Sequence, residues 1–179
     1  MSELIVVTGP PGAGKSTVAP ALSAQFESSA LVAGDQFFAF IDRGYLAPWT
    51  SEAHRQNEIV IDAAAAAAGR LAHGGYTVVY DGVIGPWFVQ TFCVAAAVSS
   101  LHYAILLPPE ELCLERVRGR ADHGFRDQGA ARHMYREFAT ARVDPRHLHD
   151  GMDDAVSIAA SLRERVRDGS LRITAESDL

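Results

Sequence analysis

Residues 9–17 constrain this chain more than any other stretch, because they read GPPGAGKST and fit the pattern G-x-x-x-x-G-K-[ST]. The apolar residues 4–7 come directly before them, and the helix-forming residues 18–22 follow. This order predicts a strand, a glycine loop and a helix. Such a loop is typical of a nucleotide-phosphate site, because successive backbone N–H groups and the positive end of a helix point at one anion.

The residue types of the loop fit this prediction one by one. The glycines allow positive φ and a close approach of the backbone to phosphate oxygens. Lys15 can reach the β and γ phosphates and is predicted to be catalytic, and the Ser16 hydroxyl is the expected Mg²⁺ ligand. The predicted nucleotide-binding residues of the loop are Gly9, Pro10, Pro11, Gly12, Ala13, Gly14, Lys15, Ser16 and Thr17.

Lys15 is the only lysine in the chain, and every other basic side chain apart from histidine is arginine. A compact ammonium group suits a position along a triphosphate better than the planar guanidinium does. The same fact excludes a Ras-type GTPase, because its N-K-x-D guanine-reading motif would need a second lysine. The loop therefore predicts a nucleotide site of another kind.

The bulk composition predicts one globular domain over residues 1–179, since 179 residues with 48% hydrophobic content can bury a full core. The net charge of -6 argues against a nucleic-acid partner, which usually needs a basic face. No run of about 18 apolar residues and no basic leader occur, so we expect a cytoplasmic protein with no membrane contact. We also expect a monomer or a homodimer. Cys93 and Cys113 lack C-x-x-C spacing and are expected to be buried free thiols.

Hydrophobic patterning predicts strands that alternate with helices. The predicted strands are 4–7, 30–33, 77–81, 102–107, a weak one at 147–149 and an edge strand at 171–173. The predicted helices are 15–26, 37–41, 51–73, 86–98, 110–118, 130–141 and 153–167. This alternation is typical of a three-layer α/β fold with a parallel sheet covered on both faces.

Two carboxylates follow predicted strands and should share the sheet edge with the phosphate loop. Asp35 is the preferred candidate for a general base that takes a proton from a substrate hydroxyl, and the alternatives are a Mg²⁺-bound water site or a helix cap. Asp81 fits a metal-side acid with Gly82 leaving room beside it, or else a plain turn residue. Spacing alone allows the two carboxylates to exchange roles.

Arginines crowd into the segment around residues 116–136, between several glycines. A lid that closes over a triphosphate and excludes water would have this composition. Arg116 and Arg120 share a helical face and are predicted to contact the nucleotide. The alternative is a solvated basic surface that pairs with Glu110, Glu111 and Glu115.

The segment between the second and third strands, about residues 36–73, is the expected place for a substrate-binding insertion. Its apolar loop and helical polar positions suit a small polar acceptor with some hydrophobic surface. The predicted acceptor-binding residues are Asp35, Phe38, Tyr45, Trp49, His54, Asn57, Asp81 and Gly82. A core role for Trp49 and a surface role for His54 are the alternatives.

The chain resembles the small P-loop kinases, which include shikimate kinase, gluconate kinase, chloramphenicol phosphotransferase and zeta-toxin-like proteins. The resemblance lies in GPPGAGKST, in AGDQFFAFIDRGYLAPWTSEAHRQN and in GGYTVVYDGVIGPW. It implies a P-loop NTPase fold with a five-stranded parallel sheet and a lid, as in nucleotide kinases. It also implies ATP with Mg²⁺, Asp35 as base or acceptor-binding group, and Arg120 as a catalytic lid arginine.

The sequence therefore favours an ATP-dependent phosphotransferase that acts on a hydroxyl of a small molecule such as a sugar acid or an antibiotic. The alternative is an ATP-binding regulatory or toxin-like module that acts on a protein partner. The predicted acceptor element and the arginine-rich lid favour the first, since a switch protein needs no acceptor pocket.

Overall fold

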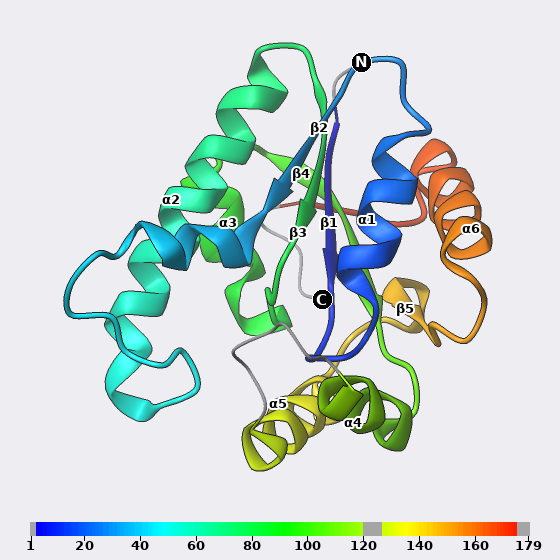
Figure 1. The fold of residues 1–179 in the computed structure, drawn as a ribbon. Helices are drawn as coiled ribbons and strands as arrows, with labels where there is room; N and C mark the ends of the chain where they lie inside the picture. Colours follow the sequence, from blue (N-terminus) through cyan, green and yellow to red (C-terminus); the bar gives the residue numbers. More distant parts are fainter. Residues whose placement is uncertain (1–2, 120–126, 175–179) are drawn as a thin grey trace.

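A computed structural model describes residues 3–119 and 127–174 and contains a twisted sheet in the order β2-β3-β1-β4-β5 (Figure 1). These strands are parallel to their neighbours, as the sequence predicts, and β6 pairs antiparallel with β4. The strands are β1 (Leu4–Thr8), β2 (Ser29–Ala33), β3 (Thr77–Asp81), β4 (Ser100–Leu106), β5 (Leu148–His149) and β6 (Arg172–Thr174).

Helices cover both faces of this sheet and thereby complete three layers (Figure 1). Helices α1 and α6 pack together on one face, α2 and α3 on the other, and α4 with α5 beyond the carboxyl ends of the strands. The α-helices are α1 (Lys15–Ser23), α2 (His54–His73), α3 (Val89–Ala95), α4 (Glu110–Gly119), α5 (Gln128–Thr140) and α6 (Ala155–Arg167). Short 3₁₀ helices are η1 (Gly34–Phe40), η2 (Ser51–Ala53), η3 (Pro86–Phe88) and η4 (Pro145–His147).

The central strand β1 is buried on both of its faces. Leu4 and Val6 contact the core beneath α2 and α3, whereas Ile5 and Val7 contact the core beneath α1 and α6. A strand covered in this way reads as a continuous apolar run, and the sequence of β1 does so. The predicted buried thiols are confirmed, since Cys93 and Cys113 are free and buried.

Several helical boundaries differ from the prediction, and three of the differences change an element. The first helix ends at Ser23, and the segment predicted as a helix at 37–41 is instead the 3₁₀ helix η1. The single helix predicted over 86–98 divides into η3 and α3, and the chain after α3 turns away because Ala97 adopts a φ of 54°. These differences lie at element ends, where local backbone conformation outweighs hydrophobic periodicity.

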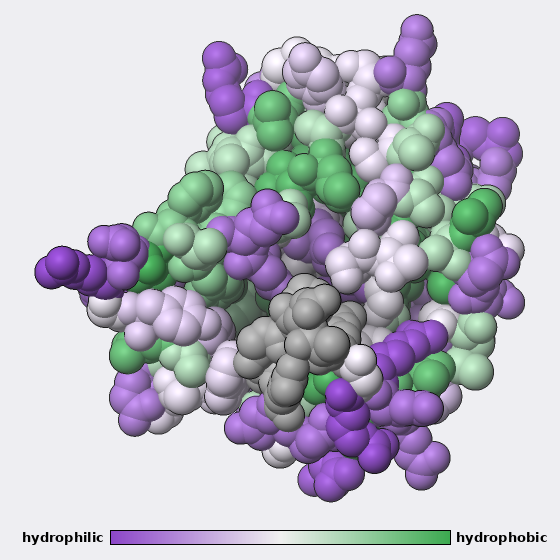
Figure 2. Space-filling view, in the orientation of Figure 1, coloured by the Kyte–Doolittle hydropathy of each residue, from purple (hydrophilic) through white to green (hydrophobic). Residues whose placement is uncertain are grey.

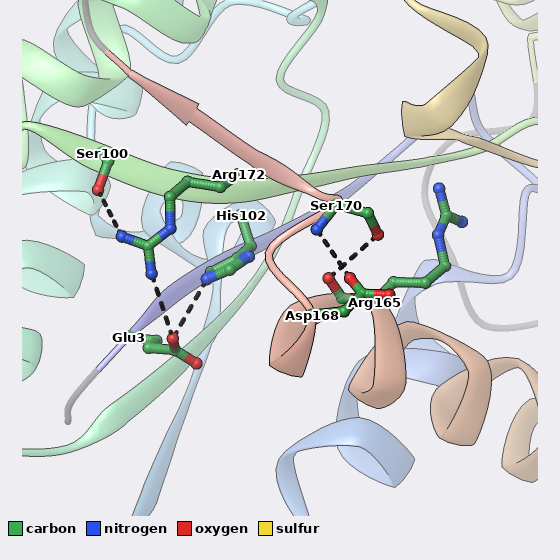
Figure 3. A network of polar contacts seen from close by, with 7 residues as sticks. All are labelled: Glu3, Ser100, His102, Arg165, Asp168, Ser170 and Arg172. Atoms are coloured by element: carbon green, nitrogen blue, oxygen red, sulfur yellow. Dashed lines mark hydrogen bonds and ion pairs between the residues drawn. The ribbon is translucent and has the colours of Figure 1, made fainter.

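A chain of polar contacts lies at the amino end of the sheet (Figure 3). His102 Nε2 lies 3.3 Å from Glu3 Oε1, and Arg172 Nη2 lies 3.5 Å from the same oxygen. Arg172 Nη1 also donates to Ser100 Oγ at 3.4 Å. This network joins the residue before β1 to β4 and β6, and it borders a cavity of about 510 Å³.

Within residues 3–119 and 127–174, no helix combines the length and the apolar character that a bilayer crossing requires.

Candidate nucleotide and acceptor site

The phosphate loop joins β1 to α1 at the carboxyl edge of the sheet (Figure 1). Gly12 has a φ of 83° and Gly14 a φ of 99°, a region that side chains disfavour. A Cβ at Gly12 would lie 2.2 Å from the Cys113 carbonyl oxygen, and one at Gly9 would lie 2.2 Å from the Leu106 carbonyl oxygen. Backbone conformation and packing therefore both require glycine in this loop.

Lys15 and Ser16 begin α1 at the end of the loop. Lys15 is buried, and its Nζ donates to the carbonyl oxygens of Gly9 at 3.0 Å and Pro10 at 3.1 Å. Ser16 and Thr17 are exposed in the first helical turn. The ammonium thus lies over the loop, and the hydroxyl groups open outward at the positive end of the helix.

The register of the sheet brings the two strand-end carboxylates to the same edge as the loop. Asp81 pairs in register with Val7 of β1 and with Ala33 of β2. Asp35 follows Ala33 by two residues and is exposed in the first turn of η1, whose N-cap is Ala33. No hydrogen bond to the Asp35 carboxylate is found within the described ranges, and Asp81 is half-buried.

Tyr80 lies between these two acidic positions, and sequence reasoning did not single it out. A Cβ at Gly34 would lie 2.1 Å from the Tyr80 hydroxyl, and one at Gly82 would lie 3.0 Å from it. The ring packs edge-on against Phe92, with centroids 4.8 Å apart. The available signal was the pair of glycines beside the two acids, because both leave room for a ring.

The environment of Tyr80 keeps its hydroxyl protonated. Burial raises the pKa of this phenol above its ordinary value, and the negative charges of Asp35 and Asp81 raise the pKa further. The site therefore contains a neutral donor close to two carboxylates at physiological pH.

Arg116 approaches the phosphate loop from α4, and its Nη1 donates to the Gly12 carbonyl oxygen at 3.3 Å. Arg132 of α5 instead pairs with Glu110, with Nε and Oε1 2.9 Å apart, as in the surface-pair alternative. The surface of α4 and α5 is strongly hydrophilic (Figure 2). Arg120 lies outside the described residues.

Residues 41–50 form an arm that hydrogen bonds hold against α2. Gln56 Nε2 donates to the Leu46 carbonyl oxygen, and Gln56 Oε1 accepts from the Leu46 amide, both at 2.7 Å. Asn57 Nδ2 donates to the Pro48 carbonyl oxygen at 2.7 Å. Of the predicted acceptor residues, Asn57 therefore fixes the arm, and His54 forms an exposed pair with Glu58 at 3.2 Å.

The predicted aromatic acceptor residues keep much of their surface in solvent. Tyr45 is 50% exposed and Trp49 is 38% exposed, so Trp49 is not a core residue. Phe38 is half-buried and follows Asp35 by three positions in η1, which places both residues on one side of that 3₁₀ helix. Among the predicted acceptor residues, Phe38 is thus the aromatic one that shares the 3₁₀ helix η1 with Asp35.

A buried hydrogen-bonded cluster fixes the segment that follows Asp81. Thr8 Oγ1 accepts from the Ile84 amide at 2.8 Å and donates to the Ile84 carbonyl oxygen at 3.0 Å. The Tyr103 hydroxyl donates to the same carbonyl oxygen at 2.7 Å. Residues 82–84 are thereby tied to β1 immediately before the phosphate loop.

The strand order and the phosphate loop define a P-loop fold. The chain matches the family AAA_33, an AAA domain, over residues 4–144, and it belongs to that family. No protein with a curated description matches its sequence. The resemblance to small P-loop kinases is confirmed at the level of the fold by solved structures.

Solved structures agree at the level of the fold. A tunicamycin resistance protein from Deinococcus radiodurans superposes with a TM-score of 0.65 at 16% identity, over 93% of this chain and 96% of its own. A gluconokinase from Sinorhizobium meliloti superposes with a TM-score of 0.58 at 19% identity, over 94% of this chain and 97% of its own. A chain of the Pnkp1/Rnl/Hen1 RNA repair complex gives 0.62 at 17% identity, over 77% of this chain and 44% of its own. This fold implies nucleotide binding.

Proposed function

We propose that this protein transfers the γ-phosphate of ATP to a hydroxyl group of a small-molecule acceptor. The observation that carries the proposal is the common sheet edge on which the phosphate loop, Asp35 and Asp81 meet. Phosphoryl transfer depends mainly on positioning and on charge stabilisation, and this edge offers groups for both.

The nucleotide would bind with its phosphates on the amides of residues 9–17 and with Lys15 moved from loop carbonyls to phosphate oxygens. The donor set fits Mg²⁺, because Ser16 offers an exposed hydroxyl and Asp81 a carboxylate across the adjacent strand. The metal would neutralise phosphate charge when bound. Arg116, beside Gly12, would contact the nucleotide from α4.

Asp35 would act as the general base. It would accept the proton of the acceptor hydroxyl while the new O–P bond forms and the bond from the γ-phosphorus to the bridging oxygen of ADP breaks. Its exposure and the absence of a hydrogen bond within the described ranges support this role, because the carboxylate is available to a ligand. In the same proposal Asp81 remains on the metal side.

Residues 36–73 would supply the acceptor-binding insertion, and residues 116–136 would supply the lid. The arm bonded to Gln56 and Asn57 presents Tyr45 and Trp49 to solvent, which suits an acceptor with some apolar surface. Arg120 would complete the lid as the catalytic arginine.

The test is ADP release from Mg²⁺-ATP with and without a panel of hydroxyl compounds that includes sugar acids, polyols, aminoglycosides and an RNA oligonucleotide with a 5′-hydroxyl. We expect at least one small molecule to raise turnover well above the basal rate. Stimulation by the RNA alone, or by a protein partner alone, would contradict the proposal and favour the corresponding macromolecular substrate. If calorimetry detected no binding of Mg²⁺-ATP, the proposed nucleotide site itself would be excluded.

A further inference from the structure

Tyr80 is a buried residue whose hydroxyl has no hydrogen-bond partner in the parts of the chain that the structure describes, and its oxygen atom is not fully enclosed by protein. The residue is 2% exposed, its ring contacts Phe92, and its hydroxyl occupies the space beside Gly34 and Gly82. A phenylalanine would fill nearly the same space, so packing alone does not account for the oxygen atom, which stays accessible to a ligand.

The position of this oxygen atom relates it to the proposed chemistry. Gly34 directly precedes Asp35, and Gly82 directly follows Asp81. The hydroxyl therefore lies between the two backbone segments that carry these carboxylates. A phenol that stays protonated offers its hydrogen to an oxygen acceptor. Asp35, beside it, accepts hydrogen. The pair thus presents one donor and one acceptor to a ligand at the carboxyl edge of the sheet.

We propose that Tyr80 determines acceptor specificity by donating its hydroxyl hydrogen to a second oxygen that neighbours the reacting hydroxyl, so that the preferred acceptors are vicinal diols or 2-hydroxy acids. This inference rests on the proposed function. The reacting hydroxyl gives its proton to Asp35, and the neighbouring oxygen receives the hydrogen bond from Tyr80. A site built in this way discriminates against an analogue that lacks the second oxygen, because the bound analogue displaces water from the Tyr80 hydroxyl and offers it no acceptor.

A kinetic test compares wild type with Tyr80→Phe on matched acceptors, namely D-gluconate against 2-deoxy-D-gluconate and glycerol against 1,3-propanediol. We expect Tyr80→Phe to raise the KM of the oxygen-rich member about tenfold while the KM for ATP stays within about twofold. We also expect the variant to lose most of the preference for that member. Tyr76→Phe is the matched control, because Tyr76 is exposed at the opposite end of β3 and should keep wild-type kinetics.

The outcomes separate this inference from the function on which it rests. Wild type that turns over no acceptor in the wider panel would overturn both. Wild type that uses a diol while Tyr80→Phe keeps the same KM and preference would overturn the inference alone. A fall in kcat that is equal for both members of each pair would also overturn it, because Tyr80 would then act through Asp35.

A stability test needs no acceptor. Because the Tyr80 hydroxyl has no protein partner among the described residues, Tyr80→Phe should keep or raise the midpoint of thermal unfolding. Tyr103→Phe should lower it by about 2–4 °C, since the Tyr103 hydroxyl donates to the Ile84 carbonyl oxygen at 2.7 Å in the core. An equal loss in both variants would show that Tyr80 has a structural partner and would overturn the inference.

Discussion

The two ends of the sheet contrast in how they use polar groups. At the amino end, His102 and Arg172 each pair with Glu3, and these contacts join the residue before β1 to β4 and β6 (Figure 3). At the carboxyl end, Lys15 rests on backbone carbonyls and Asp35 faces solvent. Polar groups that satisfy one another stabilise a fold, whereas groups held ready by backbone and packing can bind a ligand. We therefore propose a structural role for the polar groups at the amino end and a role in ligand binding for those at the carboxyl end.

The largest expected effect comes from Lys15→Ala at the carboxyl end. Loss of the ammonium removes charge stabilisation of the transferred phosphoryl group, and we expect kcat to fall on the order of 10³ or more. Acceptor-dependent ADP release measures this fall. Arg172→Ala is the control at the amino end and should retain turnover within about twofold. Similar losses in both variants would break the contrast between the two ends.

Asp35→Asn should have the next largest effect. The amide cannot take the proton of the acceptor hydroxyl, so we expect kcat to fall on the order of 10² while ATP affinity is kept. Steady-state kinetics and calorimetry with Mg²⁺-ATP give the two quantities separately. A variant with wild-type kcat would exclude Asp35 as the base and leave Asp81 as the candidate.

Two glycines with positive φ sharpen the comparison without a change of charge. Gly12→Ala places a Cβ 2.2 Å from the Cys113 carbonyl oxygen, whereas at Gly75, before β3, nothing lies within 4 Å. Both substitutions strain the backbone by about 1–2 kcal/mol. Only Gly12→Ala should add a packing cost of about 1–3 kcal/mol and weaken Mg²⁺-ATP binding. Urea unfolding and calorimetry measure these effects, and weakened nucleotide binding in Gly75→Ala would contradict the assignment.

The smallest expected effect is on the pH dependence of stability. Burial lowers the pKa of His102 and of His147 below the ordinary value. The unfolded chain therefore binds more protons than the folded chain just below about pH 6.5, and the free energy of unfolding falls as the pH decreases through that region. Above about pH 6.5 these two histidines add no pH dependence.

Urea unfolding at pH 7.5 and pH 5.5 measures this effect. We expect His147→Gln to reduce the difference between the two pH values, because His147 is fully buried and its Nδ1 donates to the Tyr103 carbonyl oxygen at 3.0 Å. His133→Gln is the control, since His133 is exposed beside Glu137. An unchanged pH difference in His147→Gln would contradict the role of its buried neutral ring.

The prediction from sequence succeeded where one residue pattern has one physical solution. The run before the phosphate loop had to be a buried strand, and the two Asp residues that follow apolar runs had to reach the same edge of a parallel sheet. The weak strand predicted at 147–149 is present as β5, which has only two residues, and the predicted edge strand is present as β6. Periodicity is informative for such elements because burial repeats along them.

The individual roles of side chains were harder to predict. His54 and Asn57 are one helical turn apart, yet one pairs with Glu58 and the other fixes the arm at Pro48. Arg116 and Arg132 belong to the same arginine-rich segment, but α4 brings the first beside Gly12 whereas the second pairs with Glu110. Such choices depend on which side chains approach from distant segments, and local spacing does not contain that information.

By itself, the sequence determined the phosphate loop, its single ammonium group and the edge of the sheet at which ligands are expected. Glycine conformation and strand direction are local properties, so they can be read from the sequence. Only the tertiary structure decided that Tyr80 fills the space left by Gly34 and Gly82. Residues 34 and 82 are far apart in the chain, and they meet one ring only because β2 and β3 pair in a fixed register.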